Sequence, residues 1–480
     1  MTSTIAVIVV IYMAVMIGIG FYARRKITDS EGYHLAGRRL GVLMLAGTLA
    51  ATEIGGGSSV GVASKAYGDW GLSAGWYVVC AGIGILLVSF VAPAMRRSMA
   101  TTVPEVIGRR YGVASQTITA VLGATALSAL AAVQITATAT IVTVLTGFSF
   151  NIAILVTGVV VVFYTWLGGM WSVTLTDFVQ FFLIVIGFAV AVPFALHKAG
   201  GWSSVLARLP EGQLGFTKIG WPTIIGLIVL YFMTFSTGQE AVQRYYSARN
   251  PRVAVWGSVL CGGVMTLYAF IPAVLGLIAL AVFPHIEANN ALATVSVGLL
   301  PPVIAGLLLS AVISATLSSA SGDLLGASTI YIKDIHPRFA SPLNDLSELR
   351  FSRFGVIGIG VIATVIALAS KAIIPLLIFA FTMRSAGPFA AFIFSLVLKR
   401  TSRRAGLVSI ILGTVAGFGW QIAGEPYHLA AIIVGGSIGV ISFLALHVWD
   451  SRAGNLVGDR LEPAEPQLPK VAVSVSGRDL

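Results

Sequence analysis

Three consecutive glycines beside a carboxylate stand out as a segment that could bind a ligand through its backbone. Gly55, Gly56 and Gly57 follow Glu53 near the middle of an apolar stretch long enough to cross a membrane. Small residues are common where membrane helices pack closely. However, three adjacent glycines do not share one helix face, and each costs about 1 kcal/mol of helix stability relative to alanine. We therefore expect local unwinding, which is tolerated at that depth where the backbone lines a cavity or is buried in protein.

Hydroxyl side chains crowd a second apolar segment, between Ser310 and Asp323. Within it Ala315, Ser318 and Ser319 stand at positions i, i+3 and i+4 and therefore share a helix face. Hydroxyls in membrane helices often bond only the carbonyl one turn back. Their density here nevertheless suits a hard cation, which prefers several oxygen ligands, and carbonyls freed by a broken helix could complete the set. The two segments together predict an ion site.

Thirteen long apolar stretches must position these residues. The chain has 480 residues, of which 57% are hydrophobic and 10% charged, with a mean hydropathy of +0.92, and a helix needs about 20 mostly apolar residues to cross a bilayer. The composition predicts an all-α, multi-pass membrane protein with about 13 transmembrane helices. The expected spans are roughly 4–23, 41–65, 72–95, 115–146, 150–170, 174–196, 222–240, 253–284, 298–330, 355–370, 373–398, 405–422 and 427–449.

The cations between these spans fall into alternate gaps. If the N-terminus is outside, 24 of the 30 lysines and arginines face the cytoplasm, five face outward, and Arg384 alone lies within a span. The positive-inside rule then predicts an external N-terminus and a cytoplasmic C-terminus in the cell membrane. Residues 1–450 would form one transporter domain, and the polar residues 451–480 a disordered cytoplasmic tail.

The distribution of charge also argues against other classes of protein. A net charge of +11 could suggest nucleic acid, but the cations flank membrane spans and form no compact basic domain, so no nucleic-acid partner is expected. The first span lacks a basic n-region and a convincing cleavage site, and Arg24 and Arg25 follow it. We therefore expect a retained helix and not a signal peptide.

A second helix break is expected in the seventh span, where Gly238 interrupts the polar run from Thr234 to Glu240. This span crosses in the opposite direction to the second, five spans earlier. Two interrupted helices in inverted positions predict an inverted-repeat transporter, with its solute bound at the repeat interface.

Charged residues within membrane spans usually mark a pathway or a binding site because they are costly there. In this chain they are Glu53, Asp177, Glu240, Asp323 and Arg384. For Asp177, an N-cap at the start of the sixth span is an alternative to ion binding, and Asp323 could sit near the cytoplasmic interface. Glu240 could pair with Arg384 or with nearby Arg244 as a structural ion pair.

In the order and spacing of these segments, the chain resembles the sodium:solute symporter family up to Trp449. The resemblance is carried by the run from Thr102 to Gly112, the run from Gly168 to Gln180, the serine-rich ninth span, and the run from Lys333 to Arg338. It implies a LeuT-like fold with a 5+5 inverted repeat, about 41–196 and 222–398. One helix is added before the repeats and two after them.

The resemblance also implies a sodium site, with sodium as the coupling ion. Matching the family's pattern residue by residue places carbonyl or hydroxyl ligands at Ala51, Ile54, Ala315, Ser318 and Ser319. Some members bind a second sodium ion, for which the matching positions are Asp177, Ser318 and Ser321. The last serine of that pattern is Gly322 here, which puts coupling to two sodium ions in doubt.

The region matching the family's solute site offers both helix breaks and their neighbours. The candidate solute-binding residues are Glu53, Gly56, Gly57, Ser58, Gln134, Gly238, Gln239, Glu240 and Arg384. Two glutamates beside the breaks predict a small solute with a cationic nitrogen, such as an amino acid or amine, since a carboxylate in a low-dielectric site needs a cation, a proton or strong hydrogen bonds.

We thus expect a sodium-coupled importer that works by alternating access, with a small solute, a sodium ion and the lipid bilayer as its partners. A symporter for a carboxylate, nucleobase or sugar remains an alternative, as does a membrane sensory module of the same fold. An integral membrane enzyme is not expected, because no nucleophile and base can be paired from the sequence.

Overall fold

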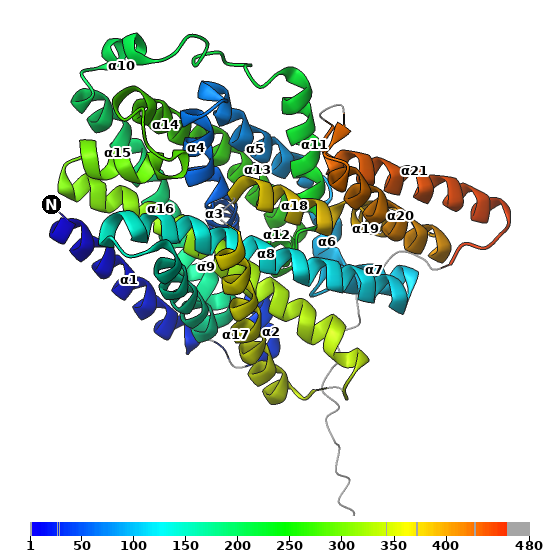
Figure 1. The fold of residues 1–480 in the computed structure, drawn as a ribbon. Coiled ribbons are helices and arrows are strands. Elements are labelled where there is room, and N and C mark those ends of the chain that lie inside the picture. Colours follow the sequence, from blue (N-terminus) through cyan, green and yellow to red (C-terminus); the bar gives the residue numbers. More distant parts are fainter. Residues whose placement is uncertain are drawn as a thin grey trace, which may run out of the picture.

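The computed structural model describes residues 2–25, 27, 29–341, 343–370, 373–426 and 429–457. These residues form a bundle of helices in which no strand is found apart from two isolated bridges (Figure 1). The helices of the first half are α1 (Thr2–Arg24), α2 (Ser30–Leu35), α3 (Val42–Glu53), α4 (Val62–Tyr67), α5 (Trp76–Val88), α6 (Ala92–Arg97), α7 (Val103–Tyr111), α8 (Val113–Thr146), α9 (Phe150–Lys198) and α10 (Trp202–Arg208). Those of the second half are α11 (Trp221–Thr237), α12 (Gln239–Ser247), α13 (Pro251–Tyr268), α14 (Phe270–Val282), α15 (Ala291–Leu299), α16 (Pro302–Ile330), α17 (Asp345–Ala369), α18 (Ile373–Ser385), α19 (Pro388–Val397), α20 (Arg403–Ile422) and α21 (Ala431–Arg452).

Helices of membrane-spanning length dominate the described residues. Nine are long and apolar enough to cross a bilayer, and two bent pairs, α11 with α12 and α18 with α19, bring the number to eleven. Val42–Glu53 and Phe150–Trp166 are shorter apolar helices. The expected all-helical membrane fold is therefore confirmed, and the count of thirteen crossings stays a prediction.

Several helices begin where the sequence supplies a capping side chain and, in two cases, a proline. Thr102 accepts a hydrogen bond from Glu105 N at 3.1 Å, with Pro104 in the first turn of α7. Asn250 accepts one from Val253 N at 3.0 Å, directly before Pro251 opens α13. Such caps satisfy amide groups that have no partner within the helix, and they fix the residue at which these helices begin.

Helix α17 begins ten residues earlier than the tenth predicted span. Its first turn is capped by Asn344, which accepts a hydrogen bond from Ser347 N at 2.9 Å. The prediction followed the apolar stretch alone and missed the polar turns that precede it.

The chain end also differs from the prediction: α21 runs to Arg452, and Val457 pairs with Thr401. A disordered tail can therefore start no earlier than residue 458, and residues 458–480 lie outside the described part.

Gly169 separates the fifth and sixth predicted spans within α9. Its φ of 50° and ψ of −159° interrupt the helical geometry. A Cβ atom at this position would lie 2.5 Å from the ring of Tyr33. Glycine is thus needed both for the positive φ and for the close approach of α2.

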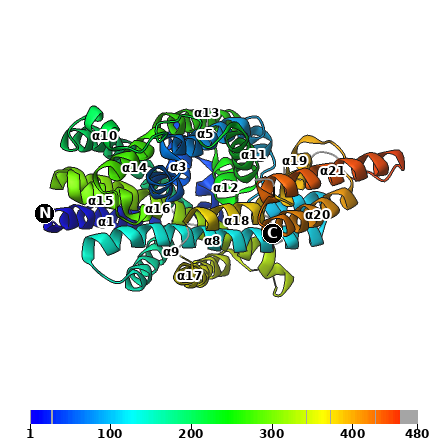
Figure 2. The same cartoon turned by 45° about the horizontal axis from the view of Figure 1, so that its top comes forward.

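Helix α16 occupies the centre of the molecule and is buried along nearly its whole length. It packs against α1, α3, α8 and α9. Viewed as in Figure 2, α5 and α13 lie along one side and α17 along the other, with α3, α16 and α8 between them. The first broken helix and the serine-rich helix are therefore neighbours in the core.

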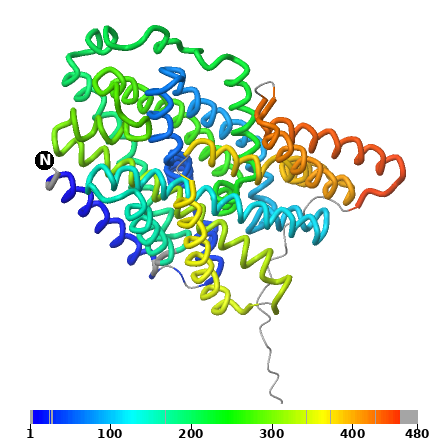
Figure 3. The backbone as a smooth tube through the Cα atoms, viewed as in Figure 1, coloured from blue at the N-terminus to red at the C-terminus, as the bar shows by residue number. Residues whose placement is uncertain are grey.

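The outer elements are α1, α20 and α21. Helix α1 packs against α9 and α16, whereas α20 and α21 pack closely on each other and contact the rest of the bundle at α18 and α19, with further contacts to α7, α8 and α11. Figure 3 traces the connection from α9 through α10 to α11, which runs over one end of the bundle.

Candidate ion and solute site

The first helix break lies where the three glycines predict it. Helix α3 ends at Glu53, Ile54 has φ −83° and ψ 67°, and a single π-helical turn covers Gly57–Gly61. A Cβ atom on Gly55 would lie 2.5 Å from Ser319 Oγ, and one on Gly56 would lie 2.6 Å from Ala137 Cβ. The glycines therefore serve two purposes: they unwind the helix, and they let its backbone approach α8 and α16.

The hydroxyl of Ser319 joins the serine-rich helix to this break. Its Oγ atom lies 2.5 Å from Thr52 O and 3.0 Å from Ala315 O. The last carbonyls of a helix lack partners within it, and those of Ala51 and Ile54 flank the one that Ser319 contacts. The structure thus brings Ser319 and Ala315 of α16 against the end of α3, in the segment that carries Ala51 and Ile54.

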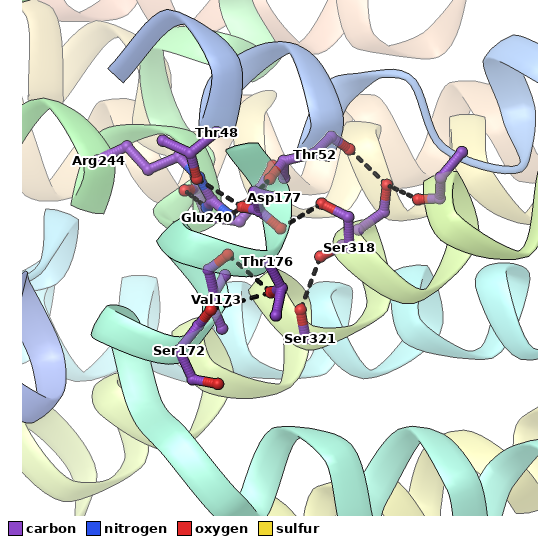
Figure 4. Close-up of polar contacts among 12 residues, drawn as sticks. Thr48, Thr52, Ser172, Val173, Thr176, Asp177, Glu240, Arg244, Ser318 and Ser321 are labelled. Atoms are coloured by element: carbon purple, nitrogen blue, oxygen red, sulfur yellow. Dashed lines mark hydrogen bonds and ion pairs between the residues drawn. The ribbon is translucent and has the colours of Figure 1, made fainter. Parts of the chain in front are cut away.

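Ser318 points in a different direction, toward Asp177 (Figure 4). Its hydroxyl donates to Asp177 Oδ1 at 2.6 Å, while Thr48 donates to Oδ2 at 2.5 Å. Asp177 has no exposed surface and lies inside α9, eight residues after Gly169. The alternative of an N-cap is therefore wrong. Ser321 turns its hydroxyl to Ser318 O at 2.9 Å and does not bond the carboxylate.

Arg244 forms a buried ion pair with Asp177. Its Nη2 lies 3.0 Å from Asp177 Oδ2, and the side chain is only 1% exposed. The sequence places Arg244 among the cytoplasmic cations, which the structure corrects: the residue belongs to α12 and lies in the core. Charge and spacing alone could not show this, because Arg244 stands only four residues beyond Glu240 in a polar segment.

The second break is also where it was predicted. Helices α11 and α12 meet at Gly238 with a bend of 56°. Beside it, Arg384 Nη1 lies 2.6 Å and 2.5 Å from the two carboxylate oxygens of Glu240. Arg384 Nε also donates to Thr234 at 3.0 Å, and its guanidinium stacks 4.9 Å above the ring of Phe381. The structural ion pair left open by the sequence is therefore formed, with Arg384 and not with the side chain of Arg244.

Gly238 leaves room for this ion pair because it has no side chain. Adding a side chain at this position therefore tests whether the break requires glycine. A Cβ atom there would lie 2.7 Å from Glu240 Oε1 and 2.8 Å from Arg384 Cζ. We expect Gly238→Ala to displace the pair and to destabilise the protein by about 1–3 kcal/mol through overpacking, with a matching loss of transport. Thermal unfolding of the purified protein would measure the loss of stability.

Gly263→Ala is the matched control, because nothing lies within 4 Å of a Cβ atom at that position in helix α13. The role assigned to Gly238 would be refuted if both variants melted at the wild-type temperature.

A small cavity of about 40 Å³ lies between the two breaks. Five of the candidate solute-binding residues line it: Glu53, Gly57, Ser58, Gln134 and Glu240. The cavity is far smaller than a typical ligand pocket, so binding requires it to widen. The sequence did not assign the rest of its lining to the solute: Thr52, Gly55, Tyr77, Leu130, Tyr231, Phe235, Ser319, Asp323, Leu377 and Phe381. Of these, Ser319 was predicted as a sodium ligand. The sequence marked Asp323 as a charge within a span, and the structure places it, buried, in the lining of this cavity.

The remaining candidates lie beside the cavity. Gly56 donates its amide to Gln134 Oε1 at 2.8 Å, which holds Gln134 against the break. Gln239 is turned away: its side chain accepts from Val103 N and donates to Thr101 O, both at 2.9 Å. Gly238 and Arg384 are not part of the lining, but Arg384 contacts two residues that are, Glu240 and Phe381.

A family model decides the class of the protein: the model of the sodium:solute symporter family matches residues 33–413. The chain belongs to this family. It is 26% identical to the sodium/pantothenate symporter of Escherichia coli (strain K12), with 95% of this chain and 96% of the relative covered. It is 24% identical to sodium/glucose cotransporter 1 of Ovis aries (89% and 74% covered) and 27% identical to high-affinity choline transporter 1 of Caenorhabditis elegans (77% and 69%).

A solved structure supports the fold. A Na⁺-coupled sialic acid symporter in a substrate-bound, outward-open state superposes with a TM-score of 0.79 at 18% identity, covering 94% of this chain and 98% of the other. The chain is thus a multi-pass membrane protein with the LeuT-like fold and a sodium-coupled symporter. The relatives are transporters, in agreement with the expectation that the protein is not an enzyme.

Proposed function

We propose that this symporter imports a small solute with a cationic nitrogen, driven by sodium, and that Glu53 is the carboxylate that faces the solute. One observation carries the proposal: Glu53 Oε1 is buried without a hydrogen-bond partner, whereas Glu240 is already paired with Arg384. A buried carboxylate oxygen without a partner is costly. A cationic solute would supply the missing partner.

Aromatic side chains favour the same class of solute. Tyr77, Tyr231, Phe235 and Phe381 line the same cavity as the carboxylates, and the rings of Tyr77 and Tyr231 meet edge to face with centroids 5.4 Å apart. Ring faces attract ammonium groups, most strongly where water is excluded. A methylated or primary amine could therefore contact rings and Glu53 at once. The name of the choline transporter among the relatives is consistent with such a solute.

Formal charges support one sodium ion together with one such solute. In their ionised forms, Asp177, Glu53, Glu240 and Asp323 together carry four negative charges, and Arg244 and Arg384 carry two positive ones. The difference is two negative charges. One sodium ion and one monovalent cationic solute would neutralise them within a medium in which net charge is expensive.

The sodium ion would bind between the unwound part of the first broken helix and α16. The proposed ligands are the carbonyls of Ala51, Ile54 and Ala315 and the hydroxyls of Ser318 and Ser319, with Ser318 rotating from Asp177 toward the ion. Elements α3 to α9 and α11 to α19 would form the two inverted repeats. Because Ser319 touches Thr52 in the cavity wall, ion binding would order the wall that the solute contacts.

Uptake into proteoliposomes tests the proposal. We expect accumulation of a quaternary amine, an amine or an amino acid only with an inward sodium gradient, and no accumulation of glucose or a simple carboxylate. Preference for a carboxylate would overturn the assignment of Glu53 and point to Arg384, whose Nη2 atom is buried without a partner. No sodium-dependent uptake of any solute would favour the sensory alternative.

The proposed orientation has its own test. Because the positive-inside rule places most cations on one side, we expect a tag before Met1 to be accessible from outside intact cells. A reporter after Leu480 should be active only in the cytoplasm. Protease protection of both ends in inverted and right-side-out vesicles would measure this. Both ends on one side would contradict an odd number of crossings.

A further inference from the structure

An apolar groove runs between the first half of α9 and α17, at the edge of the bundle (Figure 2). Its volume is about 620 Å³, which is within the range of sites that hold small organic ligands. The lining comes from positions 155–166 of α9 and 357–368 of α17. Among the described residues that line it, Thr364 and the indole of Trp166 supply the only polar side-chain atoms. The hydroxyl of Thr364 already donates to Gly360 O at 2.8 Å, so the groove suits an apolar occupant.

Two glycines shape the groove by letting its helices approach closely. A Cβ atom on Gly158 would lie 2.4 Å from Thr364 Oγ1, and one on Gly360 would lie 2.1 Å from Val162 Cγ2. Larger lining side chains point outward beside this contact, and Val365, for example, is 59% exposed. Because both segments are apolar helices of the membrane part of the chain, the groove opens toward the acyl chains of the bilayer.

Two arginines continue the groove face of α17 beyond the end of the groove. Arg353 stands four residues and Arg350 seven residues before Ile357, so all three lie on one side of the helix. The acidic residues of the first turn, Asp345 and Glu348, fall on the opposite side at about 100° per residue. Arg350 is exposed, and the Nε atom of Arg353 is buried without a hydrogen-bond partner. The groove therefore has a cationic end.

We propose that this groove binds an anionic phospholipid, with an acyl chain against the apolar lining and the phosphate held by Arg350 and Arg353. Guanidinium groups bind phosphate through paired hydrogen bonds, and a phosphate oxygen would supply the partner that Arg353 Nε lacks. The proposed orientation places the start of α17 at the cytoplasmic leaflet, where anionic lipids are concentrated. A zwitterionic lipid carries its own ammonium group, which would lie near like charges.

A lipid in this position would contact both proposed repeats, because α9 belongs to the first and α17 to the second. It would add apolar contacts between two helices that meet through small residues at Gly158 and Gly360. The inference does not depend on the identity of the solute or on the number of sodium ions.

Native mass spectrometry of the purified full-length protein would measure lipid binding. We expect dioleoyl phosphatidylglycerol to bind about tenfold more tightly than dioleoyl phosphatidylcholine, the difference that one charge-assisted contact supplies. Arg353→Gln removes a cation, and Val365→Trp fills the groove from an exposed position. Each should weaken phosphatidylglycerol binding about tenfold. The matched controls, Arg404→Gln at an exposed arginine and Val415→Trp at a valine of α20 that is 63% exposed, should bind as the wild type does.

Equal binding of the two lipids by the wild type would overturn the inference, as would phosphatidylglycerol binding in Arg353→Gln or Val365→Trp that matches its control. If Val365→Trp does not fold, dihexanoyl phosphatidylglycerol tests the groove on the wild type. Its short chains leave most of the lining uncovered, so we expect it to bind more weakly than the dioleoyl lipid. Equal binding would show that the headgroup alone is held and would refute a site for an acyl chain.

Discussion

Glu53→Gln is expected to abolish high-affinity binding of a cationic solute while sodium still binds. Glutamine keeps the size of the side chain and removes the charge. Hydrogen bonds to charged groups contribute about 1.5–3 kcal/mol each, so solute affinity should fall roughly 10- to 100-fold. Competition by quaternary amines, amines and amino acids in proteoliposome uptake would measure the loss, and ²²Na⁺ binding would be recorded on the same preparation.

Glu211→Gln is the matched control, because Glu211 lies on an exposed loop and the substitution is chemically identical. Equal solute affinity in the wild type and in Glu53→Gln would contradict the cationic-solute assignment. Loss of sodium binding in Glu53→Gln would instead indicate that Glu53 serves the ion.

Ser319→Ala should weaken sodium binding more than any other hydroxyl deletion in α16. Its Oγ atom reaches both the broken helix, at Thr52 O, and the carbonyl of Ala315. Alanine removes one oxygen from a small set of neutral ligands without adding bulk. A loss of about 1.4 kcal/mol corresponds to a tenfold change in an equilibrium constant, and we expect at least that change in the sodium concentration for half-maximal uptake.

Ser321→Ala is the control within the same helix. Its hydroxyl bonds Ser318 O, one turn back, and does not reach the broken helix, so sodium affinity should stay within about twofold of the wild type. An unchanged sodium dependence in Ser319→Ala would remove the proposed site. An equal loss in both variants would favour a site near Asp177.

Much of the fold follows from the sequence because few backbone structures can cross a bilayer. Apolar stretches of spanning length must become helices, and three adjacent glycines or a glycine in a polar run can unwind them. Both predicted breaks are present for these reasons. The 49° bend between α18 and α19 was not predicted, since the apolar pattern from 373 to 398 continues through it and only Gly387 and Pro388 mark the position.

The lining of the site was harder to predict because it depends on packing between distant segments. Tyr77, Tyr231 and Phe381 are ordinary apolar residues of their own helices, and only the arrangement of α5, α11 and α18 brings them to one cavity. Arg244 illustrates the same limit: its pairing with Asp177 joins residues 67 positions apart. Residues beside the breaks were predictable from the sequence itself, whereas residues that face the breaks from other helices, such as Gln134 and Ser319, were predicted only where the family resemblance implied them.

Gln239 links the second broken helix to the start of α7 through two hydrogen bonds. It is the first residue of α12, and its carboxamide holds both Thr101 O and Val103 N at the start of α7. A rotation of α12 must either carry α7 along or break both bonds. Because α7 also packs against α8, α19 and α20, a rotation of α12 that carried α7 along would have to change these contacts as well.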